Sequence, residues 1–195
     1  QVINIDNESK SLGGAGNVIQ NLKAFGAKVD VISVIGDCEI SSELKELLNN
    51  VNAGTQYLVS QRDRISSKKT RIIASQQQVI RYDCESTDEI NPKSQDSVLD
   101  IFKKIIKNYD LLLLSDYGKG VLTHNLTRSI ISFANKNNKR VLVDPKGFDY
   151  SKYKGAYLLT PNKKEASEAT RTSITDKKSL KKTIIQLKNE CELDI

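Results

Sequence analysis

Histidine and cysteine are scarce in this chain of 195 residues, and their scarcity excludes two classes of site. The single histidine, His124, disfavours a Ser-His-Asp triad or a His-ligated zinc site, and its place near the start of an expected helix indicates a surface or capping residue. Cys38, Cys84 and Cys191 are scattered without CxxC spacing, which predicts no cysteine metal site and indicates a reduced, cytoplasmic setting. No apolar run approaches the ~20 residues of a membrane-spanning helix, so we expect neither a membrane anchor nor a signal peptide.

Methionine is also missing, as is tryptophan. Because translation begins at methionine, we interpret residues 1–5, which read as a strand already under way, as the interior of a longer chain. Residues 192–195 resemble the start of a further strand. We therefore expect one partial domain over residues 1–195, truncated at both ends.

The net charge of +6 and the pI of about 9.1 permit nucleic-acid binding. The lysines are nevertheless spread over many expected helix faces, and neither aromatic interleaving nor a nucleic-acid-binding signature accompanies them. We therefore favour a solvated basic surface with small anionic ligands, and expect no nucleic-acid partner.

Expected strands and helices alternate along the chain, which predicts an α/β fold with a parallel sheet and helices on both faces. The expected helices begin at the glycine-rich turn near residue 13 and then cover residues 40–50, 91–108, 123–137 and 176–191. In the first helix Val18, Leu22 and Phe25 should face inward, and in the last Leu180, Ile184, Leu187 and Cys191 should do so. The expected strands cover residues 29–35, 55–59, 111–114, 141–143 and 157–160. Two further strands, 69–75 and 78–84, form a hairpin that interrupts this alternation, as a lid or an oligomer arm would.

Polar residues follow the two strands that end near residues 144 and 160. Ligands of open parallel sheets bind outside the carboxyl ends of the strands. Asp144 and Lys146 follow one strand, and Asn162 and Glu165 follow the next. Lysine neutralises phosphate charge, and carboxylates or amides position Mg²⁺ or its waters, so the two loops together predict a site for a metal-bound polyphosphate. A structural alternative is that Asn162 and Glu165 form only a capping box and that Asp144 only starts a turn.

Three other groups of residues allow both a binding role and a structural role. Gly13, Gly14 and Asn17 open a helix and suit a polyol or an anion, but they also suit a tight packing turn. The pattern there is neither GxGxxG after a strand nor a Walker A loop. Asp116 and Lys119 follow a buried strand, as binding residues or as solvated charges of a glycine turn. A further pair, Arg81 and Asp83, shares one face of a strand, as an ion pair or as a clamp over a ligand.

In this order, the motifs resemble those of the ribokinase-like (PfkB) carbohydrate kinases. The match covers nearly the whole chain and is carried by GGAGN, QQQVIRYD, SDYGKG, VLVDPKG and LLTPNKKE. It is most similar to the D-glycero-β-D-manno-heptose 7-phosphate kinase domain of bacterial ADP-heptose synthesis. The resemblance implies a three-layer ribokinase-like fold with a small β-hairpin lid at about residues 69–84.

The same resemblance implies ATP-dependent phosphorylation of the anomeric hydroxyl of the heptose 7-phosphate, with Mg²⁺, for lipopolysaccharide core synthesis. The implied substrate-binding residues are Gly13, Gly14, Asn17, Arg81, Asp83, Asp116 and Lys119. The implied ATP- and phosphate-binding residues are Asp144, Lys146, Asn162 and Glu165, with Asn162 and Glu165 holding Mg²⁺ through water. The family's lid hairpin often pairs with a second subunit, so a homodimer is expected. Bifunctional members also carry a nucleotidyltransferase domain.

The chain departs from the family pattern at one important place. The Gly-Ala-Gly-Asp run, whose Asp is the family's general base, is absent, and the first strand with its substrate-binding Asp is missing too. No catalytic residue is therefore expected within this fragment, which should be inactive alone. Two alternatives are a PfkB-type kinase of another sugar or nucleoside, and a non-catalytic ligand-binding fragment.

Overall fold

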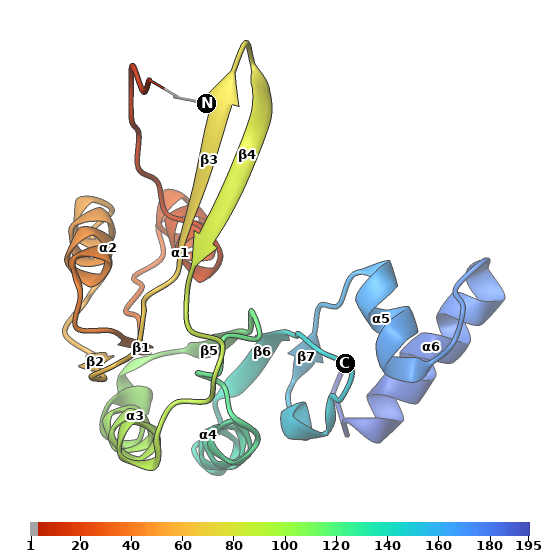
Figure 1. Ribbon diagram of the computed structural model, residues 1–195. Helices are drawn as coiled ribbons and strands as arrows, with labels where there is room; N and C mark the ends of the chain where they lie inside the picture. Colours follow the sequence, from red (N-terminus) through yellow and green to blue (C-terminus); the bar gives the residue numbers. More distant parts are fainter. Residues whose placement is uncertain (1–3) are drawn as a thin grey trace.

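The computed structural model describes residues 4–195, so the strand expected at residues 1–5 lies largely outside the described part (Figure 1). Two parallel sheets alternate with helices, as the sequence predicts for an α/β protein. The helices are α1 (Ala15–Ala24), α2 (Glu39–Asn50), α3 (Pro92–Ile105), α4 (His124–Lys136), α5 (Lys163–Thr170) and α6 (Lys177–Glu190), with short 3₁₀ turns at Ile106–Asn108 and Ser151–Tyr153. The parallel strands are β1 (Ser33–Ile35), β2 (Leu58–Ser60), β5 (Leu111–Ser115), β6 (Arg140–Asp144) and β7 (Leu158–Leu159).

The main hydrophobic core lies around β6, the central strand of the β5–β6–β7 sheet. Val141 and Val143 of β6 are fully buried, and α4 packs on this strand through a face that includes Ile131 and Ala134. Figure 1 places α3 and α4 on the same side of the strands. This core holds the carboxyl ends of three parallel strands in fixed positions, where polar loops follow them.

A smaller second core lies beside β1 and β2. It joins Leu12 and Ile19 to Leu48 of α2 and Ala53, and it is separate from the main core. The glycine-rich turn at Gly13 is therefore supported by a different hydrophobic cluster from the one that supports β6 and β7.

The hairpin of β3 (Lys68–Ala74) and β4 (Gln77–Cys84) is present where the sequence predicts it. Ser75 and Gln76 both have positive φ, of 51° and 64°, which is the backbone of a two-residue hairpin turn. The hairpin extends away from the sheets in Figure 1, and β4 is exposed along its whole length. A two-stranded hairpin without a core of its own is only marginally stable, so its position depends on the contacts at its base.

Several details differ from the sequence expectations. Phe25 is 89% exposed rather than inward, because α1 ends at Ala24 and Phe25 is the cap residue, outside the helical repeat. Leu187 of α6 and its cap residue Cys191 are buried as predicted, but Leu180 and Ile184 are exposed, and Thr183 is buried in place of Ile184.

The ends of the expected strands also change. The strands expected to begin at residues 29 and 55 begin at 33 and 58. Residues 192–195 form no strand, although the Ile195 amide donates to the Tyr157 carbonyl at 3.1 Å. Within residues 4–195, no helix combines the length and apolar character that crossing a bilayer requires.

Candidate functional site

The carboxyl ends of β5, β6 and β7 are aligned, as the proposed phosphate site requires. Ser115 pairs with Asp144 in the parallel register, and the Asp116 amide donates to the Asp144 carbonyl at 2.9 Å. The Thr160 amide donates to the Val143 carbonyl at 3.0 Å, so the β7 end lies beside the β6 end. The loops that carry the predicted residues therefore begin at one sheet edge.

Lys146 and Glu165 meet across the β6 and β7 loops. The Lys146 ammonium donates to Glu165 Oε1 at 3.0 Å. The capping box is also present: Asn162 Oδ1 accepts from the Glu165 amide, and Glu165 Oε2 accepts from the Asn162 amide, both at 3.0 Å. The structural reading of Asn162 and Glu165 is thus correct for this geometry. The cap also fixes the Glu165 carboxylate at the start of α5, within reach of Lys146.

The carboxylates of Asp144 and Glu165 both interact with the positive charge of Lys146. Burial, followed by the negative charge of Glu165, raises the pKa of Asp144, while Lys146 opposes that rise. Burial acts to raise the pKa of Glu165 as well, but hydrogen bonds from the Asn162 amide and Lys146 outweigh it and hold the pKa below its usual value. A site with two neighbouring carboxylates and one lysine suits a cation-bound phosphate chain.

The residues described by the structure include no group of three His, Cys, Asp or Glu side chains placed to hold a metal ion. Asp144 and Glu165 therefore have no third such side chain with which to complete a metal site among these residues. Both Glu165 oxygens already accept hydrogen bonds from the protein, which fits contact with a hydrated cation through water better than direct ligation.

Asp116 is buried and is held by the protein itself. Its Oδ2 accepts from the Tyr153 hydroxyl at 2.7 Å and from the Lys152 ammonium at 2.6 Å, and its Oδ1 accepts from the Gly118 amide at 2.7 Å. Sequence reasoning selected Asp116 but not Lys152 or Tyr153. These two stand in the loop between β6 and β7, and only the fold brings them to β5.

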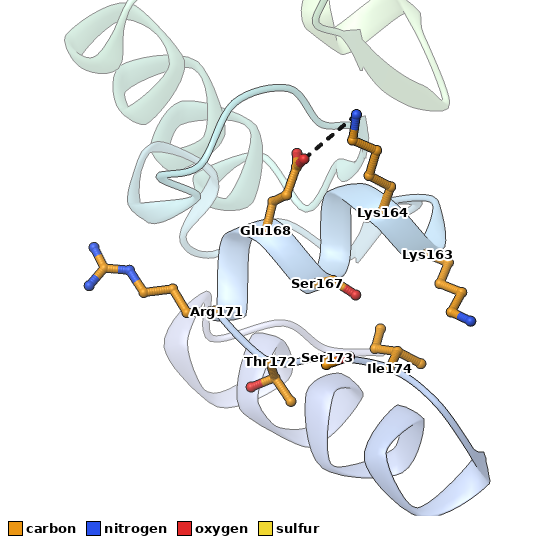
Figure 2. Close-up of a pocket in the computed structure, with 8 residues that line it drawn as sticks. All are labelled: Lys163, Lys164, Ser167, Glu168, Arg171, Thr172, Ser173 and Ile174. Carbon is orange, nitrogen blue, oxygen red and sulfur yellow. Dashed lines mark ion pairs between the residues drawn. The ribbon is translucent and has the colours of Figure 1, made fainter.

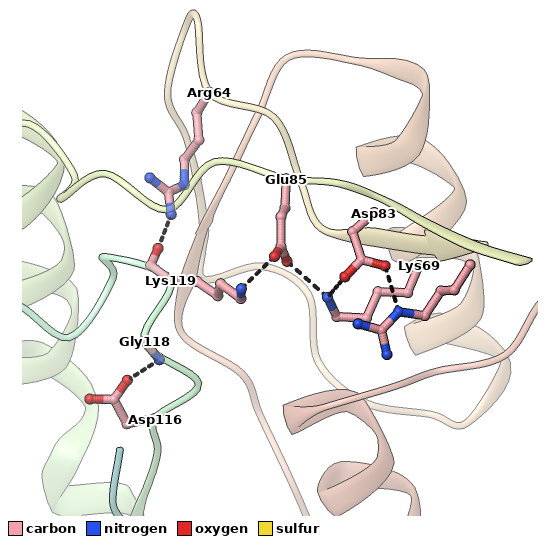
Figure 3. A network of polar contacts seen from close by, with 8 residues as sticks. Arg64, Lys69, Asp83, Glu85, Asp116, Gly118 and Lys119 are labelled. Atoms are coloured by element: carbon pink, nitrogen blue, oxygen red, sulfur yellow. Dashed lines mark hydrogen bonds and ion pairs between the residues drawn. The ribbon is translucent and has the colours of Figure 1, made fainter. Parts of the chain in front are cut away.

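Lys119 lies in a chain of alternating charges that reaches the β3–β4 hairpin (Figure 3). Its ammonium donates to Glu85, which also accepts from Lys69 at 3.3 Å. Asp83 in turn pairs with Lys69 at 2.6 Å and with Arg81 Nε at 3.1 Å. Hydrogen bonding to Lys119 lowers the pKa of Glu85, and hydrogen bonding to Lys69 lowers the pKa of Asp83. Of the two readings of Arg81 and Asp83, the structure contains the ion pair.

Arg64, which precedes β3, joins the segment after β4 to the loop after β5, and sequence reasoning missed it. It is 7% exposed, and its guanidinium donates to the Asp88 carbonyl at 3.1 Å and to the Lys119 carbonyl. Figure 3 shows it beside Lys119. No local pattern separates Arg64 from the exposed Arg62 two residues earlier, so only the tertiary structure identifies it.

The glycine-rich turn contacts the same loop. Gly14 has φ of +51°, and a Cβ built there would lie 3.7 Å from three ring atoms of Tyr117. Gly13 has open space around it, and Asn17 is exposed on the first turn of α1. The structure thus brings together the glycine turn and the Asp116–Gly120 loop, while the Lys146–Glu165 pair lies at the adjoining strand ends.

A separate hollow of about 600 Å³ opens on the surface of α5 and the segment after it (Figure 2). Figure 2 shows Lys164 turned toward Glu168, and Lys164 Nζ lies 3.8 Å from Glu168 Oε1. The lining residues include none of the predicted site residues: they are Lys163, Lys164, Ser167, Glu168, Arg171, Thr172, Ser173 and Ile174.

Comparisons with known proteins agree with this architecture. Residues 1–193 match the model of the pfkB family carbohydrate kinases. The chain is 56% identical over 195 residues to the bifunctional protein HldE of Aliarcobacter butzleri (strain RM4018). The match covers 100% of this chain and 41% of that protein. The chain is 50% identical over 195 residues to HldE of Sulfurimonas denitrificans (strain ATCC 33889 / DSM 1251), again covering 100% and 41%. The chain thus spans about two fifths of the length of these curated relatives.

Solved structures share the fold at low sequence identity. The tetrameric inhibited form of Escherichia coli phosphofructokinase-2 gives a TM-score of 0.71 at 19% identity, covering 93% of this chain and 59% of that chain. Arabidopsis thaliana ribokinase complexed with ribose and ATP gives 0.67 at 14% identity, covering 97% and 61%. These similarities establish a ribokinase-like α/β fold.

Proposed function

This chain belongs to the pfkB family of carbohydrate kinases, and we propose that its parent protein phosphorylates a sugar phosphate. The proposed reaction transfers the γ-phosphate of ATP to the anomeric hydroxyl of D-glycero-β-D-manno-heptose 7-phosphate. Its product, the 1,7-bisphosphate, would serve ADP-heptose and lipopolysaccharide core synthesis. The identity to bifunctional HldE proteins supports this choice, and the Lys146–Glu165 contact at two adjacent strand ends is the structural observation that carries it.

The phosphate side of the proposed site is built on β6, β7 and α5. Lys146 provides a mobile cation for the ATP phosphates, and Asp144 lies beside it. Asn162 and Glu165 would hold Mg²⁺ through water, and that ion would neutralise charge on the transferred phosphoryl group. Phosphoryl transfer depends mainly on positioning and charge stabilisation. The capping box of α5 holds the Glu165 carboxylate in a fixed position, as both effects require.

The sugar side of the proposed site is built on α1, the lid and the loop after β5. Gly13 and Gly14 leave room for a ligand to approach the backbone, and Asn17 can both donate to and accept from hydroxyl groups. Asp116 acts in this proposal mainly by fixing its loop, because both of its carboxylate oxygens bind protein groups. The remaining proposed contacts are Arg81, Asp83 and Lys119.

The general base is proposed to lie outside residues 1–195, because these residues contain no Gly-Ala-Gly-Asp run. The proposal therefore expects no turnover from this chain alone. The decisive measurement is ADP release by the full-length natural protein with ATP and Mg²⁺, offered the heptose 7-phosphate, fructose 6-phosphate or ribose. Turnover restricted to the heptose phosphate is the expected result.

The variant Lys146→Met tests the phosphate side in the same assay. Losing one charge-stabilising donor should lower kcat by about 10²-fold, whereas Lys178→Met, which removes an exposed lysine from α6, should leave kcat unchanged. An unchanged kcat for Lys146→Met would contradict the role given to Lys146. Turnover only with another sugar would keep the reaction class and replace the acceptor, and no turnover with any acceptor would favour a binding function.

We also propose that the lid hairpin pairs with a second copy of the chain. Its two strands expose Ile73, Val79, Ile80 and Tyr82, which are 64%, 62%, 48% and 56% exposed. Apolar side chains gathered on so small an element favour burial against a partner. Within residues 4–195, no further strand pairs with the outer edges of β3 and β4.

The variant Ile80→Lys should weaken the homodimer by about tenfold or more, because it places a charge within the buried hairpin interface. Gln77→Lys at the hairpin turn is the matched control, because it adds the same charge beside the turn. Sedimentation equilibrium of the full-length protein measures the dimer dissociation constant. A wild-type monomer, or equal dissociation constants for the two variants, would contradict pairing through the hairpin.

A further inference from the structure

Five charged side chains at the base of the lid form one connected group, the lid-base cluster: Lys69, Arg81, Asp83, Glu85 and Lys119. The group has three cations and two carboxylates, so its formal charge is +1. The carboxylates lie between the cations, as Figure 3 shows for Lys119, Glu85, Lys69 and Asp83. An uncompensated positive charge therefore stands at the junction between the lid and the body.

The cations of this cluster are more accessible than its carboxylates. The side chains of Lys69 and Lys119 are 36% and 31% exposed, whereas that of Glu85 is 13% exposed. Lys69 comes from β3, and Lys119 comes from the loop after β5. Glu85, just past β4, is the only acid within residues 4–195 that pairs with both of them. One anionic group thus bridges two structural elements that the sequence places 50 residues apart.

The cluster adjoins the proposed sugar site. The Asp116–Gly120 loop contacts the glycine turn through Tyr117 and Gly14, and it reaches the lid base through Lys119 two residues later. The Arg64 guanidinium holds this loop in place by donating a hydrogen bond to the Lys119 carbonyl. The loop that carries Lys119 therefore connects the glycine turn with the base of the lid.

We propose that Lys69 and Lys119 form the subsite for the phosphate monoester of the acceptor sugar, and that Glu85 occupies this subsite until the phosphate displaces it. The inference rests on the proposed sugar-phosphate kinase function, and assigns roles to Lys69 and Glu85. The phosphate would bridge the same two lysines that Glu85 bridges now. Its binding would tie β3 of the lid to the body.

The exchange of Glu85 for a phosphate is physically favourable. Ion pairs between partly exposed side chains contribute little, because water competes for both partners. A phosphate monoester brings about two negative charges and three strong acceptor oxygens, and its hydrogen bonds to ammonium groups are charge-assisted. An unphosphorylated sugar lacks these groups and would leave Glu85 in place, so the lid would be tied down only by phosphorylated acceptors.

In the full-length protein, removing the negative charge of Glu85 and removing the positive charge of either lysine should change phosphate affinity in opposite directions. Glu85→Gln removes the internal competitor and should lower the Kd of inorganic phosphate and the KM of the phosphorylated acceptor by about threefold. Lys69→Gln and Lys119→Gln should each raise both constants by about tenfold, as expected for losing one charge-assisted contact. Lys45→Gln, at an exposed position on α2, is the matched control. Calorimetric titration with inorganic phosphate gives Kd, and steady-state kinetics gives KM.

Competition experiments identify which phosphate binds. Inorganic phosphate should inhibit competitively against the acceptor and not against ATP; competition against ATP alone would overturn the assignment to the acceptor. Changes equal to those of Lys45→Gln, or a weaker Kd in Glu85→Gln, would overturn the subsite itself. If the wild type turns over no sugar phosphate, the proposed function fails, and the inference about the acceptor fails with it. The phosphate titration would then still show whether the cluster binds an anion. Turnover without effects at Lys69 and Lys119 would remove only the inference.

Discussion

The Gly120→Ala variant should lose about 3 kcal/mol or more of its free energy of unfolding. Gly120 has φ of +73°, which alanine adopts with strain, and an added Cβ would overlap the Asp88 carbonyl oxygen. The Gly120 carbonyl also accepts from the Ile90 amide at 3.0 Å, so the loop cannot move away without losing that bond. Urea unfolding of this domain in the full-length protein measures the loss.

Two other glycines separate the contributions of steric overlap and backbone strain. Gly36→Ala adds a Cβ that overlaps the Arg64 carbonyl, without a positive φ, whereas Gly147→Ala has φ of +94° and no neighbour within 4 Å. Gly147→Ala should therefore cost only about 1–2 kcal/mol, and Gly36→Ala should lie between the other two. A Gly120→Ala domain as stable as Gly147→Ala would show that the loop yields easily and that its close packing on Asp88 is unimportant.

Removing the Asp116 carboxylate with Asp116→Ala should cost about 3–5 kcal/mol, the range for breaking a buried ion pair at one partner. The Lys152 ammonium, on a side chain 18% exposed, and the buried Tyr153 hydroxyl would both lose this acceptor. The Gly118 amide would lose its acceptor too, so the loop that carries Lys119 would be freed. Thermal and urea unfolding measure the stability, and acceptor KM reports the position of the loop.

The milder variant Tyr153→Phe provides the matched comparison for Asp116→Ala. It removes the hydroxyl that donates to Asp116 and accepts from the Lys146 amide at 3.1 Å, and it keeps the carboxylate with Lys152, so its cost should be only about 1–2 kcal/mol. If Asp116 acted only by touching the sugar, Asp116→Ala would retain wild-type stability and show only a raised KM. That result would reverse the role that the buried contacts give to Asp116.

Much of the fold follows from local sequence signals. Asn162 with Glu165 marks the start of α5, and the capping box forms as the pattern predicts. The hairpin likewise appears at its predicted place, because alternation and a turn specify it locally. The errors occur where tertiary packing decides: α6 buries Thr183 in place of Ile184 because the neighbouring α5 selects the face, and no helical pattern encodes that neighbour.

The site is predictable only in part. Strand ends could be recognised individually, and parallel order places them at one edge, which is why Lys146 and Glu165 could be selected together. The partners of Asp116 could not, because Lys152 and Tyr153 are separated from it by a helix and a strand. Arg64 binds two backbone carbonyls, and such contacts leave no pattern of residue types in the sequence.

The two separate cores have a consequence for how the chain tolerates substitutions. The glycine turn rests on the cluster of Leu12, Ile19, Leu48 and Ala53, whereas the phosphate side rests on the core around β6. Energetic effects of substitutions at distant sites without shared partners usually add. Substitutions that change only the packing beneath the glycine turn should therefore add to the effects of substitutions around β6, so the turn can be remodelled while the strand ends of the main core keep their packing.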